Sequence, residues 1–534
     1  MTNRYLINFD TQMLSHIFTD VAVVGSGVAG LRAAIQAARH AEVIVVTKDK
    51  IDKGSTPWAQ GGIAAVLHPD DTFESHIEDT LKSGREISDP KIVKQVVHDG
   101  PGLIREMMGW GASFDKEGDD LHYTQEGGHS GPRIIHAHGD STGFEITRCL
   151  ADTTYSIDNI RVLENTFCLD LLTHEGNCVG LLVSSIADGI YCIWARQIIL
   201  ATGGCGQMYR ETTNPEVVTG DGMAAAYRAG AALQDMEFVQ FHPTTLYVAG
   251  STRALISEAV RGEGGILINR AGKPFMSNYH EKGGMAPRDV VSQSIVKEMK
   301  LTEDTNVFLD VRHIPKDDFK ARFPRIYGMC EQFDVDIAKE PIPVRPAQHY
   351  MIGGVKTDGH GRTNVTGLLA CGEVTSTGLH GANRLGSNSL LEGLVFGFRS
   401  GEAAGKAAVS GQDTPHVFRI RHEVTHPHHS PVDLWDLRHS LKSEMWRSVG
   451  IERDERTLKS ALQHIDQWSR YALHTEFDSP SGWEVQNMLT VGRTIISSAL
   501  ERTESRGAHF RKDFPEKKDE EWVRHICVVR DREH

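Results

Sequence analysis

Two apolar runs flank an alanine-rich segment near the start of the chain. VAVVG (21–25) has the pattern of a buried strand, LRAAIQAARH (31–40) has helical periodicity, and EVIVVT (42–47) has the pattern of a second buried strand. A strand, a helix and a strand in this order are typical of a parallel α/β sheet. The turn GSGVAG (25–30) has the spacing G-x-G-x-x-G, in which backbone amides and a helix N-terminus hold a pyrophosphate. We therefore expect dinucleotide binding at this turn.

Two later segments favour FAD over NAD(P). QIILATGG (197–204) and GLLACGEV (367–374) are each a strand that runs into a tight turn, and Glu373 in the second is placed to bond a ribityl hydroxyl. The acidic residue that usually follows the second strand is absent, and Lys48 and Asp49 follow instead. There is no second G-x-G-x-x-G. The order of these segments resembles flavoproteins of the glutathione-reductase fold, whose FAD domain is assembled from separated segments.

Helical periodicity dominates the chain after about residue 413. Turn residues separate three amphipathic stretches, at 431–448, 456–473 and 483–507. The residues between the FAD-type segments indicate an inserted domain. We expect an α/β fold with a Rossmann-like FAD-binding domain, an inserted α+β capping domain and a C-terminal helical bundle. The expected boundaries are 16–235 with 350–412, then 236–349, and then 413–534.

Composition narrows the possible partners. A formal charge of −14 over 534 residues argues against nucleic acid or an anionic membrane as the main partner. No apolar stretch approaches the roughly 18 to 20 residues that span a bilayer, and the first residues lack the pattern of a signal peptide. The eight cysteines show no CxxC spacing. They are interpreted as mostly reduced core thiols of a cytoplasmic protein.

Arginines and histidines gather in glycine-rich segments, which points to a small anionic substrate. The guanidinium fork matches a carboxylate better than an ammonium point charge does. Arg288 and Arg384 are therefore candidate clamps for a dicarboxylate, while His242, His349 and Ser257 add hydrogen-bonding groups. The segments that carry them are EFVQFHPTTL (237–246), ALISEAVRGEGGIL (254–267), APRDVVSQSI (286–295), QHYMIGGV (348–355) and HGANRLGSNSLLE (380–392).

In this order, the five segments resemble the succinate dehydrogenase/fumarate reductase flavoprotein family, strongly over residues 16–415 and more loosely beyond. The resemblance implies that hydride passes to the flavin while Arg288 lies over the substrate. Whether Arg288 exchanges a proton or acts mainly as a clamp stays open, because arginine is a poor base. The resemblance implies FAD contacts at Gly25, Ser26, Gly27, Val28, Ala29, Gly30, Lys48, Ser55, Thr56, Ala59, Gln60, Gly61, Gly62, Asp221, Glu373, Ser389 and Leu390.

Two departures from the dehydrogenase pattern bear on the activity. In GSTPWAQGG (54–62), Ser55 stands where dehydrogenases of the family have a histidine bonded to the flavin, which implies non-covalent FAD. In YTQEGGHSG (123–131), Glu126 is a carboxylate beside a site for anions. An isolated glutamate of this kind is usually a surface residue. The family members that oxidise L-aspartate have an acid there, and such a group would bind the substrate's ammonium while disfavouring succinate.

The resemblance therefore implies oxidation of L-aspartate to iminoaspartate, with electrons passed through FAD to O2, giving H2O2, or to fumarate. It also implies the first step of de novo NAD biosynthesis and a transient contact with quinolinate synthase. The alternative is a soluble fumarate reductase or succinate dehydrogenase flavoprotein subunit. HPHHS (426–430) lacks cysteine or carboxylate partners in metal-binding spacing, so it is interpreted as a linker and no metal site is predicted.

Overall fold

The structure, a computed structural model, describes residues 3–251, 253–410, 416–424 and 431–530. It is centred on a seven-stranded sheet in the order β10-β11-β12-β2-β3-β9, with β19 paired to β12. The strands β19, β12, β2, β3 and β9 run parallel, while β10 and β11 form an antiparallel hairpin on β12. The strands are β2 (Ser15–Val24), β3 (Val43–Val46), β9 (Ile160–Leu163), β10 (Thr166–His174), β11 (Asn177–Ser185), β12 (Gly189–Leu200) and β19 (Leu368–Ala370).

The sheet confirms the predicted α/β fold. The apolar runs at 21–25 and 197–204 supply the carboxyl ends of β2 and β12, and the run at 42–47 contains the whole of β3. The run at 367–374 supplies β19, which pairs in register with β12 from far along the chain, Ile198 opposite Leu368. The FAD-type segments therefore form one sheet although they are separated in sequence.

Helices α1 (Val28–Ala37) and α10 (Asn388–Ser410) pack on this sheet, and their backbones are in direct contact with each other. Gly393 lies at Val28 and Gly405 at Ala37, so the helices run in the same direction with their N-termini together. The glycines of α10 recur at every fourth position. A Cβ at Gly401 would lie only 2.3 Å from the carbonyl oxygen of Ala33. Three further helices cover this side of the fold, α2 (Phe73–Ser83), α3 (Pro90–Gly109) and α4 (Thr142–Tyr155).

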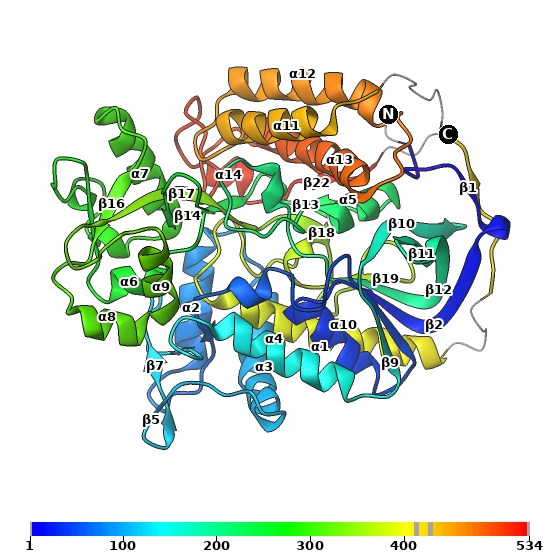
Figure 1. Cartoon of the computed structure of the whole chain (residues 1–534), viewed down its shortest axis with the longest axis horizontal. Helices are drawn as coiled ribbons and strands as arrows, with labels where there is room; N and C mark the ends of the chain where they lie inside the picture. The colour runs from blue at the N-terminus through cyan, green and yellow to red at the C-terminus, as the bar shows by residue number, and fades with distance from the viewer. Residues whose placement is uncertain (1–2, 252, 411–415, 425–430, 531–534) are drawn as a thin grey trace.

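The inserted segment builds a second sheet in the order β14-β17-β16-β15. Its helices lie at the left of Figure 1, away from the large sheet, and it has its own apolar core. The elements are β14 (Val239–Leu246), α6 (Glu258–Gly262), β15 (Ile266–Ile268), α7 (Arg288–Leu301), β16 (Val307–Asp310), α8 (Lys316–Arg322), α9 (Pro324–Gln332) and β17 (Ile342–Met351).

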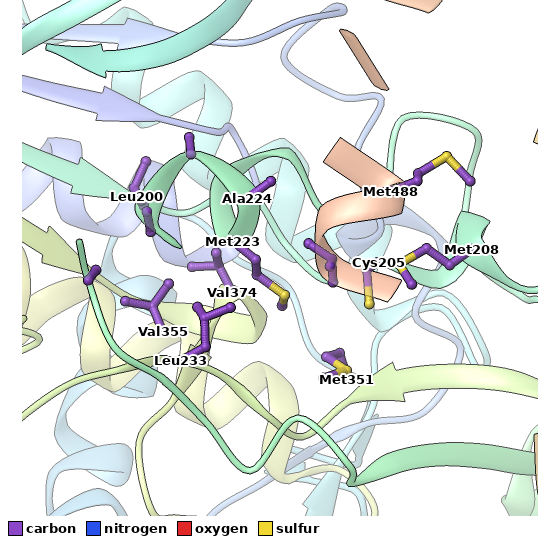
Figure 2. Packing of buried hydrophobic residues seen from close by; sticks show 14 of the residues in the cluster. Leu200, Cys205, Met208, Met223, Ala224, Leu233, Met351, Val355, Val374 and Met488 are labelled. Atoms are coloured by element: carbon purple, nitrogen blue, oxygen red, sulfur yellow. The ribbon is translucent and has the colours of Figure 1, made fainter. Parts of the chain in front are cut away.

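The C-terminal region forms a helical layer along the top of Figure 1. It consists of α11 (Leu434–Ser448), α12 (Glu455–Ala472), α13 (Pro480–Glu501) and the short α14 (Asp519–Trp522). Met488 of α13 joins Met208, Met223 and Met351 in one apolar cluster, shown in Figure 2. Unbranched methionine side chains suit such an irregular junction of elements. The bundle is therefore packed onto the FAD-type domain through a shared core.

The prediction of helix up to residue 507 was wrong at its end. Helix α13 stops at Glu501, and Arg502 has extended ψ of 105°. The next residues leave the helix because buried Arg502 pairs with Glu237 and Glu504. Gly507 lies against Ala382, where a Cβ would meet the carbonyl oxygen at 2.3 Å. The ion pairs of Arg502 and the close contact at Gly507 therefore decide the backbone conformation after residue 501, although the sequence keeps a helical pattern to residue 507.

Four smaller sheets complete the described fold. One contains β20 (Thr375–Ser376), β18 (Gly354–Lys356), β13 (Leu233–Gln234) and β22 (Cys527–Val528), and another contains β4 (Ile63–Ala64), β8 (Ile134–Ile135) and β7 (Tyr123–Thr124). The other two are strand pairs, β5 (Lys116–Glu117) with β6 (Asp120–Leu121) and β1 (Phe9–Asp10) with β21 (Arg421–His422). No described helix has the length and apolarity that crossing a membrane requires. The HPHHS stretch lies outside the described residues, so its interpretation as a linker stays a prediction.

The contact between α1 and α10 predicts the effect of adding one methyl group. Gly401→Ala should lower the free energy of unfolding by about 1 to 3 kcal/mol, because the new Cβ forces the helices apart. Thermal unfolding would measure this as a lower midpoint. Gly102→Ala on α3 is the matched control, since nothing lies within 4 Å of its Cβ position, and it should leave the midpoint unchanged or slightly raised. Equal midpoints for both variants would contradict the packing argument.

Candidate active site

A cavity of about 990 Å³ runs from the glycine-rich turn to the inserted segment. It is lined by nearly every residue singled out in the sequence. On the dinucleotide side these are Gly25, Ser26, Gly27, Val28, Ala29, Lys48, Ser55, Thr56, Ala59, Gln60, Gly61, Gly62, Asp221, Glu373, Ser389 and Leu390. On the side of the inserted segment they are Glu126, His242, Ser257, Arg288, His349 and Arg384.

Gly30 is the exception, because it is not among the residues that line the cavity. A Cβ there would lie 2.0 Å from the carbonyl oxygen of Gly25. The third glycine of the turn therefore allows α1 to pack closely against the loop and does not itself face a ligand. Gly25 must also be a glycine, because a side chain at this position would collide with neighbouring backbone. Its φ is +111°, and a Cβ would meet the Ala201 carbonyl oxygen at 2.2 Å.

The dinucleotide side has the features that FAD requires. The amide of Val28, the first residue of helix α1, donates to Thr56 Oγ1 at 3.1 Å, and the residues of this first turn, Val28 and Ala29, line the cavity. Ser55 Oγ and Gln60 Oε1 are buried and have no hydrogen-bond partner among the described residues. Such orphaned polar atoms in the cavity wall fit the polar edge of a flavin. These residues fit FAD: the N-terminus of α1 would hold the pyrophosphate, and residues 55–62 would contact the isoalloxazine.

Lys48 meets its partners only through the tertiary structure. Its ammonium donates to Thr219 Oγ1 at 2.8 Å, to Asp221 Oδ2 at 2.7 Å and to Glu484 Oε1 at 2.8 Å. Burial opposes the charge, but the two carboxylates outweigh it and raise the pKa of Lys48. Asp221, which comes from a different part of the chain, thus places a carboxylate beside Lys48 in the cavity wall.

Glu373 lies in the cavity wall at the end of β19. One of its carboxylate oxygens accepts a hydrogen bond from the backbone amide of Met351 at 2.9 Å. Burial raises the pKa of Glu373 to about 7. At neutral pH the group therefore exists in both protonation states, and it can donate to a ligand hydroxyl or accept from one.

Arg384 and Arg288 enter the cavity from opposite domains. The guanidinium of Arg384 lies 4.4 Å from the centre of the Tyr350 ring and donates to Ser389 Oγ at 3.0 Å. Its Nε is buried and has no partner within the described part of the chain. Arg288, the first residue of α7, donates from Nε to Glu258 Oε2 at 2.6 Å. Two guanidinium groups in one cavity provide the clamps that a dicarboxylate needs.

The two histidines of the site are neutral. Their rings lie 5.2 Å apart in a T-shaped arrangement. Burial, reinforced by neighbouring positive charge, holds the pKa of His242 and of His349 well below the usual range. His349 Nδ1 lies 2.9 Å from Thr213 Oγ1, while His242 Nε2 has no partner in the described chain. His242 Nδ1 lies 3.0 Å from the Thr244 carbonyl oxygen, which can only accept, and the Thr244 amide lies 3.2 Å from the same nitrogen. The two rings therefore add hydrogen-bonding groups to the cavity wall without adding charge.

Ser257 has a structural contact besides its place in the cavity wall. Its hydroxyl oxygen accepts from the backbone amide of Ala259 at 3.3 Å and caps the short helix α6. The cap orients the following residue, Glu258, toward Arg288. The role of Ser257 in binding a substrate stays a prediction.

Glu126 is buried at 3% exposure and is not part of an exposed turn. Its Oε2 accepts from Ser387 Oγ at 2.8 Å, and its Oε1 has no partner among the described residues. Burial, together with the charge of Glu258, raises the pKa of Glu126 in spite of nearby Arg288. A Cβ at Gly386 would lie 3.2 Å from Glu126 Oε2 and 3.2 Å from Arg288 Nη2. The carboxylate and the clamp therefore face the same space.

Four residues of the site were not singled out in the sequence. Glu258 follows Ser257 directly, and Ser387 lies within the segment GANRLGSNS, so both were next to residues that were named. Tyr350, under Arg384, adjoins His349. Thr213 had no signal, since its role depends on a loop that only the fold brings to His349.

Comparison with known proteins identifies the family. A family model for an FAD binding domain matches residues 20–390, and one for the fumarate reductase flavoprotein C-terminal region matches residues 438–534. The chain is 43% identical to an L-aspartate oxidase of Streptomyces coelicolor, over 96% of this chain and 91% of that protein. It is 41% identical to a chloroplastic L-aspartate oxidase of Arabidopsis thaliana, over 93% of this chain and 81% of that protein.

Solved structures agree with this assignment. The E. coli quinol fumarate reductase chain FrdA superposes with a TM-score of 0.90 at 32% identity, covering 97% of this chain and 95% of that chain. The Mycobacterium smegmatis Sdh1 complex gives a TM-score of 0.82 at 34% identity, covering 94% of this chain and 90% of that chain. The chain therefore belongs to the family of FAD-binding flavoproteins that contains the L-aspartate oxidases and the succinate dehydrogenase/fumarate reductase flavoproteins.

Proposed function

We propose that the chain oxidises L-aspartate to iminoaspartate and passes two electrons through FAD to O2, giving H2O2, or to fumarate. One observation carries the choice of substrate. Glu126 is a buried carboxylate whose Oε1 has no partner in the described chain, and it shares its cavity with Arg288 and Arg384. A buried carboxylate so placed attracts the ammonium of aspartate and repels a dicarboxylate that lacks one.

The clamps account for the two carboxylates of the substrate. Arg288 and Arg384 offer guanidinium forks, and the neutral imidazoles of His242 and His349 add hydrogen-bonding groups without further charge. Burial and the charge of Arg288 lower the pKa of Arg384 to about 10. Arg384 therefore remains charged at neutral pH, and an anionic ligand relieves its repulsion from Arg288.

The chain's own residues prepare the amine for oxidation. FAD, when bound, accepts the two electrons of the substrate Cα–H bond as a hydride. That bond breaks readily only when the amine is neutral, so the ammonium must first lose a proton. The raised pKa of Glu126 makes Oε1 a suitable acceptor for this proton. Arg288, oriented by Glu258 at 2.6 Å, serves in this proposal as clamp and electrostatic stabiliser.

The nearest alternative is a soluble fumarate reductase or succinate dehydrogenase flavoprotein subunit. The fold, the FAD side and the arginine clamps are compatible with either activity. The names of the relatives at 40 to 43% identity support L-aspartate oxidation. Glu126 supports L-aspartate oxidation independently, because its buried negative charge repels succinate, which has no ammonium group.

The proposal extends to the cofactor linkage and the domains. Ser55 lies in the cavity wall and has no ring nitrogen to bond a flavin, which supports non-covalent FAD. We assign residues 16–235 and 350–412 to the FAD-binding domain, 236–349 to the capping domain and 413–534 to the helical domain. The separate sheet of β14 to β17 and its own apolar core support these boundaries.

The proposed pathway position is the first step of de novo NAD biosynthesis, in the cytoplasm. Imines hydrolyse in water, which supports a transient contact with quinolinate synthase as the enzyme that takes the product. The names of the relatives support the pathway.

Glu126→Gln tests the substrate assignment. The amide keeps the shape of the side chain but cannot take a proton from an ammonium. We expect kcat/KM for L-aspartate to fall by at least about 100-fold, the size typical for removing one partner of a buried charge pair. Fumarate reduction should survive or improve. The measurements are anaerobic bleaching of the flavin by L-aspartate and by succinate in separate samples, and fumarate reduction with a reduced viologen dye.

Glu78→Gln, on the exposed face of α2, is the matched control and should leave both activities unchanged. Bleaching of the wild-type flavin by succinate but not by L-aspartate would overturn the proposed function. Equal losses of aspartate and fumarate turnover in Glu126→Gln would overturn the role of Glu126.

Arg288→Lys tests the clamp. Lysine keeps the positive charge but lacks the planar guanidinium, which can donate to Glu258 and to a substrate carboxylate at the same time. We expect kcat for L-aspartate to fall by about 100-fold or more, measured by stopped-flow flavin reduction. Arg105→Lys, at an exposed position of α3, is the control. Reduction within threefold of the wild-type rate would show that charge alone is sufficient.

A further inference from the structure

The two carboxylate oxygens of Glu126 have different surroundings. Oε2 accepts the hydroxyl of Ser387 at 2.8 Å, whereas Oε1 is buried without a partner among the described residues. A Cβ at Gly61 would lie 3.7 Å from Ser387 Oγ and 3.8 Å from Glu126 Oε1. The free oxygen therefore lies beside the 54–62 loop on the dinucleotide side of the cavity. The hydroxyl of Ser387 decides which oxygen stays free.

Ser387 is held in a backbone conformation that non-glycine residues seldom adopt. Its φ is +61°, in the left-handed region. Its carbonyl oxygen accepts from the amide of Ala64 at 3.1 Å. The carbonyl of Gly386 accepts from His129 Nε2 at 3.0 Å, and His129 belongs to the same turn as Glu126. Contacts on both sides thus maintain the conformation, as expected for strain at a functional position.

We propose that Ser387 is a positioning residue for amine recognition, because its hydroxyl orients the Glu126 carboxylate so that Oε1 faces the ammonium of an α-amino dicarboxylate. This inference rests on the proposed function. Ser387 acts through Glu126 and requires no contact with the substrate's carboxylates. It therefore contributes to the preference for an amino acid and leaves the binding of the carboxylates to the arginine clamps.

The hydroxyl also favours the ionised form of Glu126. The charged groups that face this carboxylate are Glu258, Arg288, Arg261 and Arg322. Burial and Glu258 raise the pKa of Glu126, while Arg288, the hydrogen bond from Ser387 and Arg322 lower it. Loss of the hydroxyl therefore raises the pKa further. A larger fraction of the enzyme then has a protonated Glu126, which cannot take a proton from the ammonium.

The test compares Ser387→Ala and Ser387→Gly with the wild-type, FAD-loaded enzyme. We expect both variants to lose about 10- to 100-fold in kcat/KM for L-aspartate, the range for a hydrogen bond to a charged group. Fumarate reduction with a reduced viologen dye should stay within threefold. The acid limb of the kcat/KM profile for L-aspartate should move to higher pH, because Glu126 must be ionised to act.

The glycine variant separates positioning from backbone strain. Glycine adopts φ near +61° without cost, so Ser387→Gly keeps the loop conformation even if Ser387→Ala fails to fold. Ser400→Ala is the matched control, because Ser400 is a buried serine of α10 that does not line the cavity and whose hydroxyl donates to the Phe396 carbonyl of its own helix at 2.6 Å. It should show neither the loss nor the shift in pH profile.

The outcomes distinguish the two proposals. A wild-type enzyme without aspartate-dependent flavin reduction overturns the proposed function, and the role of Ser387 with it. A wild-type enzyme that oxidises aspartate, with Ser387→Gly within twofold of it, overturns the role of Ser387 alone. Equal losses of aspartate oxidation and fumarate reduction, or an unmoved acid limb, also overturn it, since they indicate a general structural effect.

Discussion

The close packing of α10 on α1 is the constraint on which both halves of the cavity depend. Gly393, Gly397 and Gly401 bring α10 onto the backbone of α1, and the helices run in the same direction. Their N-termini are therefore side by side, and residues of both first turns line the cavity. Two positive helix ends in one wall favour a bound pyrophosphate. The loop that enters α10 carries Arg384 and Ser387, so the same contact positions the substrate side.

The second organising feature is the set of buried charges around Glu126. Arg288 pairs with Glu258 at 2.6 Å, Arg261 lies 3.7 Å from Glu258, and Ser387 bonds Glu126 at 2.8 Å. Removing such charges from water is costly unless each has partners. Among the described residues, Glu126 Oε1, Arg384 Nε and two nitrogens of Arg261 have no hydrogen-bond partner, and of these three residues Glu126 and Arg384 line the cavity. A ligand that carries both an ammonium and carboxylates would satisfy the two groups together, which is the physical reason for favouring an amino dicarboxylate.

Much of the cofactor side could be predicted because it depends on local sequence. The turn at 25–30 needs glycine for backbone reasons that act within a few residues, and the apolar runs at 197–204 and 367–374 are recognisable as strands. Gly30 shows the limit of this reasoning, since it supports helix packing and does not line the cavity. The prediction that the helix extends to residue 507 was wrong because a contact with a distant residue, which the sequence pattern does not show, ends the helix earlier. Arg502 leaves the helix to pair with Glu237, a residue far away in the chain.

The sequence by itself determined the α/β class, the glycine-rich turn and the arginines that line the cavity, because glycine spacing, strand patterns and residue chemistry are local properties. Only the tertiary structure decided which groups meet. It placed Asp221 and Glu484 on Lys48, Thr213 on His349 and Ser387 on Glu126. Each of these contacts joins distant segments, and no local pattern encodes a distance between them. The protonation of Glu126 likewise depends on burial and on neighbouring charges, which exist only after the domains have come together.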